Sequence, residues 1–125
     1  MYYNTPHHDL GSSIYVYLDG KAKKYQKEFE TFATYIIQDE VINGANFWQY
    51  VTKKKCIWYA NGAWRVGKAE DLGTQKCALC APGMKDDLPG DLRGQWSYWN
   101  PDKNEWVKER DYIVKVRWWH DPVYI

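Results

Sequence analysis

Cys77 and Cys80 come nearest to a chemical motif, because they form the short sequence Cys-Ala-Leu-Cys. This spacing is typical of half of a tetrahedral zinc site, which needs four nitrogen or sulfur ligands. The remaining candidates are Cys56 and the histidines His7, His8 and His120, and none of them stands at zinc-knuckle spacing. We therefore predict no cofactor, and zinc on Cys56, Cys77 and Cys80 is the alternative if a metal is bound.

The same pair could also form a disulfide or act as a redox pair. A redox-active CxxC motif normally opens a helix, whose dipole lowers the pKa of the first thiol. Here Ala81-Pro82-Gly83 follows, which favours a loop. Plain loop cysteines, a local or long-range disulfide, and a redox pair all stay open. With 3 cysteines in the chain, at least one thiol is free or bonded to another chain.

No motif of a common catalytic site occurs in the sequence. The chain lacks a G-x-S-x-G elbow, an H-E-x-x-H metal motif and a P-loop. In His120-Asp121 a carboxylate could orient a base, but no nucleophile is recognisable beside it. We therefore predict that the protein is not an enzyme and has no catalytic residues.

Aromatic side chains are the other group that could carry a function. The chain holds 8 Trp, 11 Tyr and 3 Phe, which together make up 18% of its residues. Exposed Trp and Tyr supply hot spots at protein interfaces, and they can stack on sugars. At least half of these rings must form the core of so small a domain, so the candidates for binding are those on the opposite faces of strands.

The hairpin over residues 56–67 best separates the two faces. Asn61-Gly62 between alternating apolar residues predicts a two-residue type I′ turn, which pairs Trp58 with Arg65. Side-chain parity then assigns four residues to the core face: Ile57, Tyr59, Trp64 and Val66. Trp58 and Arg65 lie on the other face. The same reasoning along the chain predicts a ligand or partner surface of six residues: Tyr15, Tyr17, Trp58, Arg65, Trp99 and Trp119.

Short alternating segments predict the other elements. Strands are expected over 14–18, 34–38, 46–52, 95–99, 105–107 and 112–118, with a weaker preference for strand in 21–33 and a loop over 68–94. Strand spacing and turn signals predict an all-β fold, a small antiparallel sandwich or barrel of about seven to nine short strands. Residues 1–13 are expected to form an irregular lead, and residues 14–125 a single aromatic-rich β domain.

Charge narrows the range of partners. With 17 Lys and Arg against 16 Asp and Glu, the net charge is +1, so no overall field favours nucleic acid. The lysine clusters at 21–24 and 53–55 are expected to protect strand edges, and nucleic acid is an unlikely partner. No run approaches the roughly 20 apolar residues of a membrane span. The odd cysteine count and the absence of a signal-peptide pattern slightly favour an intracellular location.

Several segments also follow one another in a familiar order: Val16–Gly20, Val41–Tyr50, Ile57–Tyr59, Trp64–Gly67, Asp71–Gly73, Gln95–Trp99, Trp106 and Val114–Val116. This order resembles a Trp/Tyr-rich β module that is repeated in multidomain eukaryotic proteins, often secreted or on the cell surface. The similarity spans residues 14–117. It implies an all-β binding module without catalytic residues, and it implies an extracellular role, so the location stays open.

Taken with the surplus of aromatic residues, these features favour a non-catalytic binding module. Its expected partner is another protein, bound through an exposed aromatic and basic surface. A lectin-like module that stacks the same rings on sugars is the first alternative. A zinc or redox protein built on the cysteines is the second.

Overall fold

The computed structural model describes residues 13–52, 54–108 and 113–119. Nine strands form within these residues: β1 (Ser13–Leu18), β2 (Phe32–Ile42), β3 (Ala45–Tyr50), β4 (Lys55–Ala60), β5 (Ala63–Lys68), β6 (Leu79–Pro82), β7 (Ser97–Asn100), β8 (Glu105–Lys108) and β9 (Val114–Trp118). They are joined by one short helix, α2 (Gly20–Tyr25), and by the 3₁₀ turns η1 (Ala69–Asp71) and η2 (Pro89–Asp91). None of the helices in the described part of the chain has the length and apolarity that crossing a bilayer requires.

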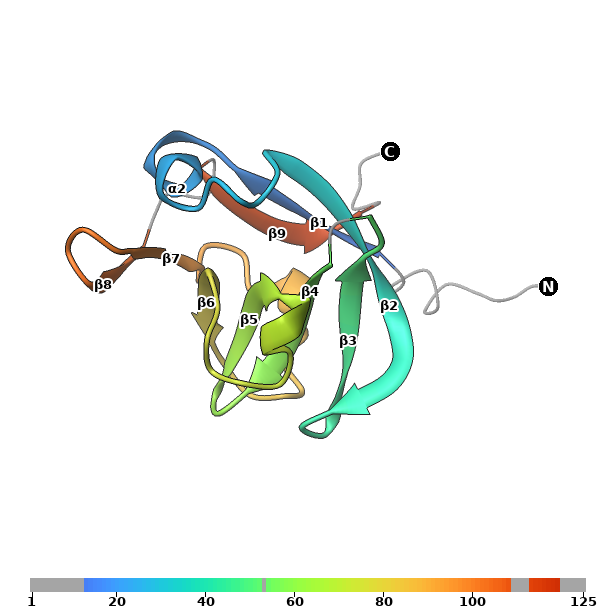
Figure 1. The fold of residues 1–125 in the computed structure, drawn as a ribbon. Helices are drawn as coiled ribbons and strands as arrows, with labels where there is room; N and C mark the ends of the chain where they lie inside the picture. Colours follow the sequence, from blue (N-terminus) through green and yellow to red (C-terminus); the bar gives the residue numbers. More distant parts are fainter. Residues whose placement is uncertain (1–12, 53, 109–112, 120–125) are drawn as a thin grey trace.

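All nine strands join into one antiparallel sheet with the order β8-β7-β6-β5-β4-β3-β2-β1-β9. The sheet curls into a half-barrel (Figure 1). Strand β2 bends where its register to β3 shifts between Ile37 and Val41, as expected of a β-bulge. The prediction of an all-β antiparallel fold is therefore confirmed.

The hairpin of β4 and β5 has the register that its turn predicts. Asn61 and Gly62 both have positive φ, at 47° and 79°, as a type I′ turn requires. Tyr59 pairs with Trp64 and Trp58 pairs with Arg65. The two turn residues fix this register. A slip by one residue would also move every side chain to the opposite face, so burial of the core face supports the same pairing.

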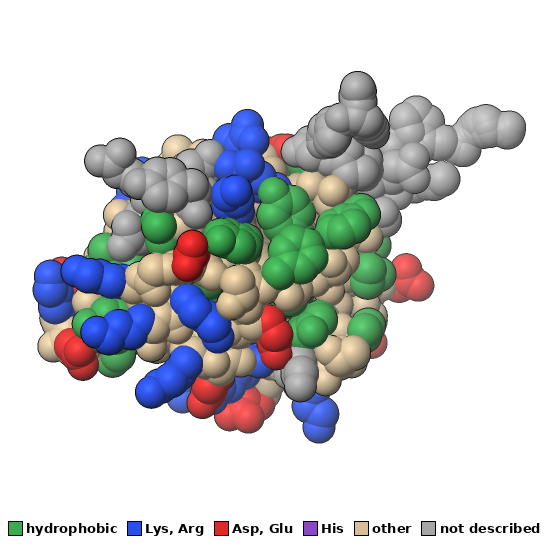
Figure 2. Space-filling model, turned by 90° about the horizontal axis from the view of Figure 1, so that it is seen from above, with side chains coloured by type: hydrophobic (Ala, Val, Ile, Leu, Met, Phe, Trp, Pro, Cys, Tyr) green, Lys and Arg blue, Asp and Glu red, His purple; other side chains and the backbone are tan. Residues whose placement is uncertain are grey.

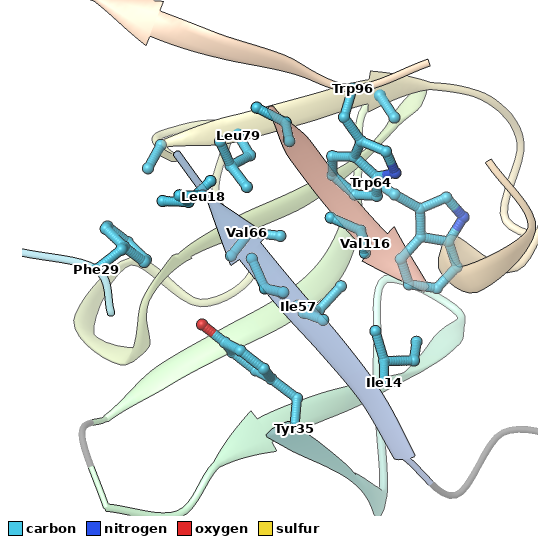
Figure 3. Packing of buried hydrophobic residues seen from close by; sticks show 14 of the residues in the cluster. Ile14, Leu18, Phe29, Tyr35, Ile57, Trp64, Val66, Leu79, Trp96 and Val116 are labelled. Atoms are coloured by element: carbon cyan, nitrogen blue, oxygen red, sulfur yellow. The ribbon is translucent and has the colours of Figure 1, made fainter. Parts of the chain in front are cut away.

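The concave face of the sheet holds the main core. Trp48 is buried there and makes edge contacts with Trp64 and Trp118, at ring-centroid distances of 5.9 and 6.1 Å. Aliphatic side chains belong to the same cluster, and Figure 3 shows Ile57 and Val116 among them. Aromatic pairs in this geometry are worth about 0.5–1.5 kcal/mol beyond their buried area.

Two contacts link the halves of the curled sheet. At one, the indole of Trp118 lies over Gly90 in η2, and its Nε1 donates a hydrogen bond to Asp91 Oδ1 at 2.7 Å. At the other, α2 packs against β7: the ring of Tyr25 stacks on that of Tyr98 at 6.2 Å. These contacts cover the core where no strand pairing does.

Two segments differ from their predicted structure. Residues 20–25 form a helix instead of the strand favoured for 21–33, because Asp19 caps the segment and Ala22 is buried within it. The predicted loop over 68–94 contains β6, which pairs with both β5 and β7. Its four residues carry little β propensity of their own, so this strand depends on its two neighbours.

The prediction that Trp58 and Arg65 are exposed is wrong. Trp58 is 0% exposed and Arg65 is 7% exposed. Residues 69–78 cover this face of the hairpin and form a second cluster with it: Phe47, Cys56, Trp58, Ala60, Ile42, Ala69, Leu72 and Cys77. Parity identifies the face on which a side chain lies, but a distant segment decides whether that face meets water.

Gly67 in β5 makes this covering possible. A Cβ atom there would lie 2.6 Å from Trp58 Cη2 and 3.2 Å from Cys77 Cα.

We expect Gly67→Ala to destabilise the fold by about 1–3 kcal/mol, because overpacking forces Trp58 out of its place. In a Trp58→Phe background the penalty should fall, since the smaller ring has no atom at that position. Chemical denaturation of the four proteins in this cycle measures the coupling, and additive effects would contradict it.

Candidate functional site

The outward side of β2, β1 and β9 carries aromatic and basic side chains together. The strand register places Tyr15 beside Arg117 and Tyr17 between Lys115 and Phe32. We call this surface the outer aromatic face, and it comprises Tyr15, Tyr17, Phe32, Ile36, Lys115, Arg117 and Trp119. The neighbouring residues of the same strands, such as Val16 and Val116, point into the core. Alternation along three adjacent strands thus produces the surface.

Three rings of this face contact one another. The ring of Tyr15 stacks on that of Phe32 at 5.4 Å and meets that of Trp119 edge-on at 6.3 Å. Phe32 and Trp119 lie 5.9 Å apart with their planes inclined by 56°. Phe32 is nevertheless 49% exposed and Trp119 is 52% exposed. Viewed from above, hydrophobic side chains gather in one patch with basic side chains beside it (Figure 2).

Positive charge borders the rings. Lys115 Nζ lies 5.3 Å from the centroid of the Tyr17 ring, a cation–π distance. Tyr17 donates a hydrogen bond from its hydroxyl to Asp19 Oδ2 at 3.1 Å, and this bond raises the pKa of the phenol. Tyr17 therefore stays neutral at physiological pH, and the lysine lies over an uncharged ring.

No family model, curated protein or solved structure matches the chain. The resemblance to a repeated Trp/Tyr-rich β module accordingly stays a prediction from the sequence.

The structure brings together three of the six predicted surface residues: Tyr15, Tyr17 and Trp119. Phe32 was missed because the clear strand prediction began at Thr34, two residues after the start of β2, and residues 21–33 had only a weaker preference for strand. Extending the alternation of Ala33 and Tyr35, which are both buried, back by one residue would have placed Phe32 on the outward side.

Trp99 lies apart from this surface. It contacts Trp106 across the hairpin of β7 and β8, with ring centroids 5.2 Å apart. It also borders a pocket of about 340 Å³ between the segment after α2 and the end of β5. Glu28 and Lys68 form an ion pair of 2.7 Å on the wall of this pocket. The hydrogen bond to Lys68 lowers the pKa of Glu28, but an exposed pair of this kind adds little stability.

The cysteines lie on the opposite side of the hairpin from the main core. Cys77 and Cys80 both approach the guanidinium of Arg65, whereas Cys56 is fully buried in the second cluster. Across residues 13–52, 54–108 and 113–119, no three His, Cys, Asp or Glu side chains gather as a metal site would require. His7, His8 and His120 lie outside the described residues. Zinc therefore stays the alternative that the sequence left open.

The basic clusters are partly tied into the fold. Lys55 is buried: its Nζ donates to the carbonyl of Glu28 at 2.7 Å and lies 4.9 Å from the centre of the Phe29 ring. Lys23 donates to the carbonyl of Phe29 at 2.7 Å. These two amines hold the turn after α2 in place, so they do not contribute to a basic groove.

Trp118 and Trp119 are adjacent but belong to opposite faces, which allows a direct comparison. Trp118→Ala removes a core ring and should cost about 3–5 kcal/mol. Trp119→Ala removes an exposed ring with two aromatic neighbours and should cost about 1 kcal/mol or less. Urea denaturation of both variants measures the difference. Equal losses of stability would mean that Trp119 is part of the core.

Proposed function

We propose that the protein is a non-catalytic binding module that docks a protein partner on the outer aromatic face. The observation that carries the proposal is the exposed pair of Phe32 and Trp119, which contact each other and Tyr15 outside the core. Exposing apolar surface costs roughly 25 cal/mol per Å², and contiguous exposed patches commonly mark interaction sites. A partner would recover that free energy by covering the rings.

The charges of the face indicate the chemistry of the partner. Lys115 and Arg117 project from β9 on the same side as the rings. A cation at the edge of an apolar patch attracts acidic side chains and sets the orientation of docking. The best-fitting partner segment therefore presents an aromatic or aliphatic anchor flanked by Asp or Glu.

The inclination of the rings favours protein over sugar. A sugar ring stacks on a flat aromatic surface, whereas the planes of Tyr15 and Trp119 are 84° apart. The ring of Phe32 is stacked on that of Tyr15 at 28°, but Trp119 is inclined to both, so the three rings do not form one flat stacking surface. The lectin-like alternative predicts binding on a glycan array, and protein recognition predicts none.

The test begins with peptides selected from a random display library against the whole protein. Selected peptides should contain an apolar anchor next to acidic residues. Replacing Phe32 or Trp119 by Ala should weaken their binding by about 30-fold, the loss expected of a hot spot worth 2 kcal/mol. Trp106→Ala is the matched control, because Trp106 is also exposed, at 40%, but lies on β8. Calorimetry or surface plasmon resonance gives the affinities.

A charge reversal tests whether the cations of the outer aromatic face attract acidic residues of the partner. Lys115→Glu should slow association with the selected acidic peptides, and the effect should shrink as salt is added, because exposed charges are screened. Binding that resists both Phe32→Ala and Trp119→Ala but is lost in Trp106→Ala would place the interface elsewhere. Selective glycan binding that depends on Trp119 would replace the protein partner with a sugar.

A further inference from the structure

Arg65 is a buried cation whose hydrogen-bond partners are neutral. Its Nε donates to the carbonyl of Ala60 at 2.9 Å, and its Nη1 donates to the carbonyl of Gln75 at 3.2 Å. In the described part of the chain, its polar contacts include no carboxylate. Burial of a charge is costly unless an opposite charge or strong hydrogen bonds compensate for it.

Two thiols lie where a counter-ion is needed. Arg65 Nη1 is 3.7 Å from Cys77 Sγ and 4.0 Å from Cys80 Sγ. Cys80 is held there because β6 pairs it directly with Arg65, and Cys77 precedes the strand in the segment that covers the hairpin. Of the groups that contact Arg65 among residues 13–52, 54–108 and 113–119, only these thiols can become anionic.

The environment makes the two thiols unequal. The hydrogen bond with Cys77 and the charge of Arg65 lower the pKa of Cys80 to about 7, against the effect of burial. The same hydrogen bond, together with burial, raises the pKa of Cys77. Cys56 has no such neighbours, and burial raises its pKa to about 11. These directions favour Cys80 as the thiolate and Cys77 as its hydrogen-bond donor, and they keep Cys56 protonated at neutral pH.

Reagents can reach the pair. Cys77 and Cys80 are both partly exposed, and Cys77 lines the pocket of about 340 Å³ beside Gly67 and Lys76. A thiolate that is partly exposed and next to an arginine is the setting in which cysteines become reactive. This differs from the helix-opening arrangement of CxxC motifs, because a guanidinium on the next strand takes the place of the helix dipole.

We propose that Cys77 and Cys80 form a redox-active dithiol that exchanges with small-molecule disulfides, with Arg65 stabilising the attacking thiolate. In the first step Cys80 Sγ attacks one sulfur of the small disulfide, and a mixed disulfide forms as one small thiolate leaves. Cys77 then gives up its proton to that thiolate and attacks Cys80 Sγ, which releases the second small thiolate. The protein pair is oxidised to one disulfide, and the small disulfide is reduced to two thiols, the second of which takes a proton from solvent.

This inference is independent of the outer aromatic face, and mass spectrometry tests it with glutathione as the probe. The full chain is equilibrated in buffers of reduced and oxidised glutathione, quenched, alkylated and cut with trypsin. Cleavage after Lys76 and Lys85 leaves both cysteines in the peptide 77–85, whereas Cys56 falls in the peptide 56–65. As the buffer becomes oxidising, peptide 77–85 should lose two hydrogen atoms and take no alkyl label. Peptide 56–65 should stay alkylated throughout.

Single-cysteine variants separate a reactive pair from a structural one. Cys77→Ser keeps a hydrogen-bond donor beside Cys80 and leaves Arg65 in place, so Cys80 should be alkylated readily at pH 7, with a midpoint below the value of about 8.5 for an ordinary thiol. In Cys80→Ser the remaining Cys77 should react about tenfold or more slowly at that pH. Arg65→Met in the Cys77→Ser background should slow Cys80 by a similar factor, while Arg65→Lys should preserve most of the rate. If the Arg65→Met variant does not fold, the pH profile of Cys80 alkylation and the rate in the Arg65→Lys variant still test whether Arg65 stabilises the thiolate.

Two results would overturn the proposal. One is a peptide 77–85 that stays doubly alkylated in the most oxidising buffer. The other is an alkylation rate of Cys80 that matches Cys56 across the pH range, because Arg65 would then have no effect on the thiol.

Discussion

The structure depends on a contact that closes the curled sheet at a place where no strands pair. Trp118 on β9 makes this contact by lying over Gly90 in η2, where a Cβ atom would come within 2.5 Å of the indole ring. The hydrogen bond from its Nε1 to Asp91 fixes the orientation of the indole. The edge strands of the sheet are β8 and β9, so without this contact the core around Trp48 would be open to water on one side. Glycine is needed at position 90 because of this close approach.

Closure also accounts for the high aromatic content. A small domain with few leucines fills its concave face with large rings, and Trp48, Trp64 and Trp118 do so in edge-to-face contact. Trp58 serves a second, smaller cluster on the other side of β4 and β5. Phe32 and Trp119 serve neither cluster, and their contact with each other leaves them as an apolar surface. Among the described residues, one group of rings outside the core therefore lies on β9 and its neighbours β1 and β2, and a second pair, Trp99 and Trp106, lies on β7 and β8.

The sequence predicted what local chemistry determines. Asn61-Gly62 fixed a hairpin with the right pairing, and alternation placed Tyr15 and Trp119 outside the core. The prediction of exposure was wrong for Trp58 and Arg65, because residues 69–78 cover their face, and hydrophobic periodicity within the hairpin carries no information about such coverage. A redox pair was one of the alternatives that the sequence left open, but the position of Arg65 beside it was missed for the same reason. Cys77 and Cys80 were recognisable as a pair, but their arginine neighbour comes from pairing between β5 and β6, and the residues of β6 predicted a loop.

The aromatic residues divide between the core and an exposed surface, and hydroxyl-radical footprinting read by mass spectrometry tests this division most directly. In the free protein, Phe32 and Trp119 should be oxidised much faster than Trp58 and Trp118. When a bound peptide is added, protection should appear on Phe32 and Trp119 and leave Trp106 unchanged. Rapid oxidation of Trp58, or protection that bypasses Trp119, would contradict the account.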